Sequence, residues 1–164
     1  MSNLYDLVED NSGFQFINNA GDEYNVYFVE YYLIDPNHLP DGVKPIYTIG
    51  FNCVRQNPNA KQRFDNKTKN TILNIFRSFF ENHPEDAFIF ICDNSDERER
   101  QRRITFGKWF REDNEDDKFE RHHSHIVHYG SNWYSSLIIS KDCPNKVELI
   151  DAYRFTIRQM LEAL

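Results

Sequence analysis

The chain has 164 residues, 40% hydrophobic and 27% charged, and this length and composition predict one folded domain with a core large enough to be stable alone. A formal net charge of −7 disfavours general binding to nucleic acid, because the phosphate backbone is also negative. We expect neither a signal peptide at the acidic N-terminus nor a membrane span, since no apolar run approaches roughly 18 residues.

The N-terminal third predicts three antiparallel strands. Residues 14–34 contain two apolar stretches joined by the turn "NAGD", which indicates a hairpin. The second stretch is rich in Tyr, Phe and Val on both faces, so we expect it inside the sheet. Residues 46–54 alternate as a half-buried strand does, with one face carrying Tyr47, Ile49, Phe51 and Cys53.

A helix and a buried strand follow. Apolar residues recur at helical spacing after a cap at Asp65 or Asn66, and the helix ends at "NHP", residues 82–84. The continuous apolar run "AFIFIC" has the length of a strand buried on both faces. Asn94 and Glu97 form a capping pair for a second helix that runs to about Phe110.

The last part predicts a hairpin and a helix. The segment "RHHSHIVH" and the segment "WYSSLIIS" indicate two strands with "YGSN" as their turn, and residues 146–164 form an amphipathic helix. This helix either caps the sheet or forms a homodimer contact. The order β-β-β-α-β-α-β-β-α predicts an α+β domain with a mixed, mostly antiparallel sheet, a core over residues 14–140 and a C-terminal helix.

The element order from residue 14 to residue 140 is similar to the core of the GNAT acetyltransferases, without that family's first strand and first two helices. The chain more closely resembles a domain-of-unknown-function family of Bacteroidota. The shared features are the helix start from Asp65 to Ile72, the "FF" within that helix, "ICDN-D" after the buried strand and "WF" closing the second helix. This second resemblance implies no assigned activity.

The GNAT resemblance implies acetyl-CoA as the cofactor, bound on a glycine-rich loop at a helix start. The matching loop here, residues 55–67, contains no glycine, and its candidates for cofactor binding are a cationic rim of Arg55, Lys61, Arg63 and Lys67. The tyrosine that the family uses as a general acid is also absent, because Thr105 and Phe106 occupy that neighbourhood.

Four of the six histidines lie within residues 121–128. Strand alternation places His123 and His125 on one face, where they are candidate metal ligands that need a third ligand from elsewhere. His122 and His128 share the other face but are roughly 20 Å apart by strand rise, too far for one ion. A pH sensor is a second interpretation, and a polar strand near the sheet edge is the third.

Two further groups are candidates for chemistry or binding. Arg98 and Arg102 form a small basic stripe that suits an acidic partner or a phosphate. The three cysteines form no CxxC pair, which favours reduced thiols in a cytoplasmic protein, and the apolar surroundings of Cys53 make it an inert thiol rather than a nucleophile.

These observations predict a small bacterial cytoplasmic protein with a degenerate GNAT-like fold that binds a protein or small molecule and is not an enzyme. The alternative is an atypical acyl-CoA-dependent N-acyltransferase that uses the cationic rim in place of the glycine loop. That alternative predicts a V-shaped cleft between the strands at residues 45–54 and 86–92. Strands that pair along their whole length would exclude it.

Overall fold

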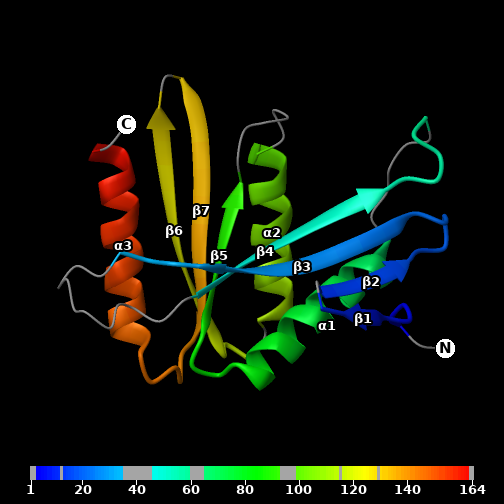
Figure 1. The fold of residues 1–164 in the computed structure, drawn as a ribbon, viewed down its shortest axis with the longest axis horizontal. Helices are drawn as coiled ribbons and strands as arrows, with labels where there is room; N and C mark the ends of the chain where they lie inside the picture. Colours follow the sequence, from blue (N-terminus) through cyan, green and yellow to red (C-terminus); the bar gives the residue numbers. More distant parts are fainter. Residues whose placement is uncertain are drawn as a thin grey trace. The chain divides into compact units, whose positions relative to one another are not determined.

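The computed structural model describes residues 3–11, 13–34, 46–59, 65–92, 99–114, 116–128 and 130–162. Within these ranges the chain forms three helices and a seven-stranded sheet, which confirms the predicted α+β class (Figure 1). The strands are β1 (Val8–Asp10), β2 (Gly13–Ile17), β3 (Glu23–Tyr31), β4 (Ile46–Val54), β5 (Ala87–Cys92), β6 (Phe119–His128) and β7 (Ser131–Ser140). The helices are α1 (Asn66–Asn82), α2 (Glu99–Asp113) and α3 (Lys146–Glu162).

The strands follow the order β1-β2-β3-β4-β5-β7-β6. The described registers are antiparallel except that of β4 and β5, which pair in parallel at Tyr47↔Phe88 and Thr48↔Ile89. β3 and β5 each have a neighbour on both sides, as their two-sided apolar patterns predicted. β1 was not predicted, so the observed order begins one strand earlier than expected.

Backbone proximity divides the chain into two compact units. The first unit contains residues 1–29 and 49–82, and the second contains residues 30–48 and 83–164. Each unit has buried side chains of its own. The single domain that the length suggests stays a prediction.

Aromatic rings dominate the core of the first unit. Tyr5 stacks on Phe16 and Phe16 stacks on Tyr24, with ring centroids 5.7 and 4.9 Å apart. Phe79 of α1 stacks on Phe28 of β3 at 4.8 Å. Offset stacking of this kind adds to the free energy gained by burying the rings, so the contact of Phe79 with Phe28 helps to hold α1 to the strands.

In the second unit, two helices cover opposite faces of β5, β7 and β6. Phe106 of α2 contacts Phe90 of β5 on one face, with ring centroids 3.9 Å apart. On the other face α3 lies alongside β6 and β7, as Figure 1 shows, so the final helix caps the sheet. The core under α3 contains Leu33, Ile46, Ala87, Ile89, Ile126, Leu137, Ile139, Cys143, Leu149, Ile150, Ala152, Tyr153 and Ile157.

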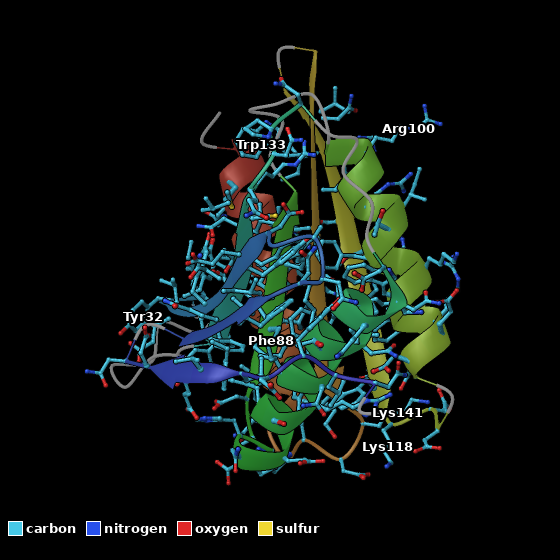
Figure 2. All side chains as sticks on the ribbon, turned by 90° about the vertical axis from the view of Figure 1, so that its right-hand side faces the viewer. Tyr32, Phe88, Arg100, Lys118, Trp133 and Lys141 are labelled. Atoms are coloured by element: carbon cyan, nitrogen blue, oxygen red, sulfur yellow. The ribbon has the colours of Figure 1, made fainter. Side chains whose placement is uncertain are left out.

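The β6–β7 hairpin is paired from one end to the other. Its register runs from Phe119↔Ser140 to His128↔Ser131, and the Lys141 amide extends it by donating a hydrogen bond to the Lys118 carbonyl at 2.9 Å. Figure 2 shows these two lysines together at one end of the hairpin and Trp133 toward the other end. Continuous pairing on one side means that β6 is held firmly by β7.

Candidate functional site

The cationic rim proposed for the cofactor loop is only partly described. A guanidinium N–H of Arg55 donates to a backbone carbonyl of its own loop at 3.1 Å, and the Lys67 ammonium lies 4.4 Å from the centroid of the Tyr5 ring. Lys61 and Arg63 lie outside the described residues. The described structure therefore does not bring the four cations together, and their role in binding a cofactor stays a prediction.

Asp65 occupies the N-terminus of α1. Its Oδ1 accepts a hydrogen bond from the Thr68 backbone N–H at 2.6 Å, and its Oδ2 accepts one from the Tyr5 hydroxyl at 3.1 Å. Asp65 is thus the helix cap, as one of the two predicted alternatives had it. Because a carboxylate already meets the positive end of the helix dipole, an incoming phosphate would be repelled there.

His123 and His125 lie on the face of β6 that α2 covers. The His125 ring stacks on Tyr134 with centroids 4.5 Å apart, and its Nε2 lies 2.8 Å from Oδ1 of Asn132. No group of three His, Cys, Asp or Glu side chains in the described ranges has metal-site geometry. The candidate metal pair therefore has no third ligand within those ranges.

The predicted arginine stripe cannot be placed. Arg98 lies outside the described residues, and so does the side chain of Arg102. The arginine of α2 whose contact is described is Arg103, whose guanidinium lies over the Tyr134 ring at 4.6 Å from the centroid. Its charge is thereby directed at the aromatic face within the second unit.

On the opposite face of β6, charged groups are close together near the start of the strand. The Glu120 carboxylate lies 3.5 Å from the Lys146 ammonium and 3.5 Å from Nε2 of His122. That Nε2 is enclosed and makes no hydrogen bond to any residue in the described part of the chain. Glu120 is therefore flanked by a lysine and an imidazole, and its charge is balanced locally.

A hollow of about 330 Å³ lies beside β6 and α3. It is lined by Arg121, His122, His123, Ser124, Tyr153, Arg154 and Ile157. Side chains alternate between the two faces of a strand, so four consecutive strand residues can line one hollow only where it runs along the edge of the strand. β6 is the last strand in the sheet order, and its edge away from β7 has no strand beside it in the part of the chain that is described.

The contacts of the neighbouring side chains confirm this geometry. The Nε–H of Arg121 donates to Oγ of Ser136 at 3.0 Å, and its guanidinium lies near Gly107 of α2, so this side chain is on the α2 face. Ser124, in contrast, contacts Tyr153 of α3. The hollow is therefore bounded by the backbone edge of β6 and by one side of α3.

Three hydroxyl groups form a closed set at this position. Oγ of Ser135 lies 2.9 Å from Oγ of Ser124 and 2.8 Å from the Tyr153 hydroxyl, and the Tyr153 hydroxyl donates to Ser124 at 3.3 Å. Each hydroxyl can donate once and accept once around the ring, so the buried members are satisfied. We call Ser124, Ser135 and Tyr153 the hydroxyl triad.

Ser124, Tyr153 and Arg154 are not among the site residues predicted from the sequence. The pair of serines within the apolar strand "WYSSLIIS" did indicate a buried polar contact at this position, because a buried hydroxyl needs a hydrogen-bond partner. The identity of that partner depends on how α3 lies against the sheet, which local sequence does not specify.

The two described thiols are not activated. Burial raises the pKa of Cys53, and burial likewise raises the pKa of Cys143, whose Sγ–H donates to the Glu85 carbonyl at 3.4 Å. Because the thiolate is the reactive form, a raised pKa makes both cysteines poor nucleophiles. This agrees with the expectation that Cys53 is inert.

A family model described as a family of unknown function (DUF6169) matches residues 64–155. The chain belongs to this family. No curated protein and no solved structure matches the chain. The DUF6169 segment begins just before α1 and ends within α3, so it contains every residue that lines the hollow except Ile157. In the ranges described, this DUF6169 protein has no helix long and apolar enough to cross a membrane.

Proposed function

We propose that this DUF6169 protein is a binding module that takes up an extended polypeptide segment along the free edge of β6. The observation that carries the proposal is the hollow beside four consecutive residues of a terminal strand. A terminal strand presents backbone N–H and C=O groups with which a further strand can pair. Recognition of this kind takes its affinity from main-chain hydrogen bonds and its specificity from pockets for alternate side chains.

α3 supplies the side-chain part of the site. Ile157 offers apolar surface at the hollow and Arg154 offers a cation, while the Tyr153 hydroxyl is already bonded within the triad. A segment paired with β6 would direct every second side chain toward α3. The site therefore combines a main-chain edge with a short row of side chains of mixed character.

A degenerate GNAT-like fold is the structural setting that we favour. The sequence resembled a GNAT core without its first strand. The structure has an additional strand, β1, before the three strands that were predicted at the start of the sheet. The absence of glycine from residues 55–67 and the carboxylate of Asp65 at the start of α1 both argue against a phosphate cradle there. A bacterial cytoplasmic setting, in Bacteroidota, rests on the sequence motifs and is part of the proposal.

The second candidate is the atypical acyl-CoA-dependent N-acyltransferase. It rests on the similarity of element order to the GNAT core and on the cations that the sequence places in residues 55–67. A calorimetric titration with coenzyme A separates the two candidates. We expect no heat of binding, whereas micromolar binding together with acetyl-group turnover would establish the acyltransferase and overturn the binding module.

The binding module is tested by selection of peptides followed by mapping. Random ten-residue segments displayed on phage are selected on the full-length chain, and a selected peptide is added to ¹⁵N-labelled protein. We expect the largest amide shifts at residues 121–124 of β6 and at the adjoining turn of α3. Failure to enrich any segment, or shifts confined to residues away from β6, would overturn the proposal.

N-methylation of the peptide adds a test of strand pairing that leaves the protein unaltered. Alternate amides of an added strand point toward and away from β6, so methyl groups on one set remove main-chain hydrogen bonds and those on the other set do not. We expect affinity to fall about tenfold or more for one set only, which corresponds to one or two lost hydrogen bonds. Equal losses for both sets would show that the segment does not bind as a strand.

A further inference from the structure

The hollow beside β6 is lined by an arginine of α3, Arg154. The lining contains no carboxylate. Arg154 is exposed on α3 and forms no ion pair with the described residues. The nearest acidic side chain along the strand, Glu120, is flanked by Lys146. An exposed arginine beside a backbone edge is suited to bind a carboxylate.

We propose that the segment bound at the β6 edge is acidic, with a carboxylate paired to Arg154 and an apolar side chain packed on Ile157. This inference rests on the proposed function and adds the chemistry of the partner. Arg154 and Ile157 are three residues apart in α3, so both are on the same side of the helix. Neighbouring inward positions of one added strand, two residues apart, can therefore contact both.

A second copy of this chain fits the same edge less well. β6 of a second copy would present one glutamate, one arginine and four histidines. Its one formal cation, Arg121, would be brought to the same edge as Arg154, and its one carboxylate is already contacted by Lys146. The net charge of −7 also separates copies at long range. An acidic segment supplies a carboxylate for Arg154, whereas β6 of a second copy does not.

The same net charge determines where the preference should appear in the kinetics. At physiological ionic strength the Debye length is about 8 Å, so the charge of Arg154 is largely screened until the segment is close to contact, and the net charge of −7 supplies no long-range attraction for an acidic segment. We therefore expect the charge preference in the dissociation rate rather than in the association rate.

The test repeats the phage selection on three proteins: the wild type, Arg154→Glu and the control Arg158→Glu. Arg158 is exposed one turn further along α3 and does not line the hollow, so the control makes the same charge change on the same helix. Wild type and control should enrich Asp and Glu. The Arg154→Glu protein should enrich Lys and Arg, and should bind the wild-type peptide about tenfold more weakly through faster dissociation.

Each outcome separates this inference from the proposed function. Peptides that bind at β6 without enrichment of Asp or Glu, or equal loss of affinity in both variants, would overturn the acidic partner and leave the binding module intact. Enrichment of segments that resemble β6, with self-association of the wild type in sedimentation, would identify a second copy and overturn the acidic partner. Selection of no segment would overturn both.

Discussion

The hydroxyl triad offers the most direct test of how α3 is attached to the sheet. Tyr153 is 2% exposed and Ser135 is 9% exposed, so both hydroxyls are removed from bulk water. Tyr153→Phe deletes one oxygen from the ring of three and leaves Ser124 and Ser135 bonded to each other at 2.9 Å. One buried serine then lacks a partner for a donor or an acceptor.

The expected cost follows from that unmatched group. A net hydrogen bond contributes about 0.5–1.5 kcal/mol, whereas leaving a buried polar group unsatisfied costs about 1–3 kcal/mol. We therefore expect Tyr153→Phe to lower the free energy of unfolding by about 1–2 kcal/mol. Urea denaturation followed by circular dichroism measures the change, with the m-value checked for constancy. Tyr32→Phe is the matched control, because Tyr32 is 67% exposed and should change stability by less than about 0.5 kcal/mol.

A double variant tests whether the three hydroxyls act together. Ser135→Ala alone leaves the Tyr153 hydroxyl bonded to Ser124 at 3.3 Å, and Tyr153→Phe with Ser135→Ala removes two members at once. The double variant should cost less than the sum of the single variants by at least about 0.5 kcal/mol, because fewer unmatched groups remain. Additivity within about 0.3 kcal/mol, or a Tyr153→Phe cost no larger than the control, would refute this account.

Three further predictions concern other parts of the chain. Asp65→Ala should lower the free energy of unfolding by about 1–2 kcal/mol, because it removes the cap of α1. Asp65→Asn should retain most of that stability, because asparagine also caps helices, and urea denaturation measures both variants. Gly107→Ala should be neutral or stabilise by about 0.5–1 kcal/mol, because a Cβ there meets the flexible guanidinium ends of Arg121, at 3.1 Å, and Arg111, at 3.6 Å; a loss above about 1 kcal/mol would contradict this. With the other two cysteines changed to serine, Cys143 should react with iodoacetamide more slowly than a free cysteine at pH 8. Burial raises the pKa of Cys143, so there is a pH range in which the thiol is ionised in the unfolded chain but neutral in the folded protein. The free energy of unfolding should therefore fall as pH rises from the unfolded pKa through the raised pKa.

The strands with strong apolar patterns were predictable, and the one without such a pattern was not. The continuous apolar run of β5 identified a central strand, and Ala87, Phe88 and Ile89 are at most 1% exposed. β1 has the sequence "VED", and all three residues are exposed. It pairs with β2 through backbone hydrogen bonds and one exposed polar contact, from Gln15 to Asp10, and such pairing leaves no hydrophobic period to detect.

The candidate site was predictable only in the part that depends on strand alternation. Alternation separated His123 from His122, and the polar composition of the segment predicted a strand near the sheet edge, which the strand order confirms. The contribution of α3 was not predictable. Arg154 lies 26 positions after His128, the last residue of β6, and its position beside β6 is determined by the packing of the whole helix. Local periodicity shows that a helix has an apolar side but not which strand that side meets.

The composition of β6 bears on why its edge is open. Proteins commonly protect terminal strands with lysine, proline, a bulge or a short length, because a long bare edge pairs with other chains. β6 is ten residues long and contains neither lysine nor proline. Its two formally charged residues are engaged within the second unit, Arg121 with Ser136 and Glu120 with Lys146. At residues 121–124 the side chains left to discourage pairing with another strand are therefore imidazoles and a serine, which oppose such pairing less than an unpaired charge would. Repulsion between copies of net charge −7 disfavours self-pairing, and the cation at Arg154 favours an acidic strand in its place.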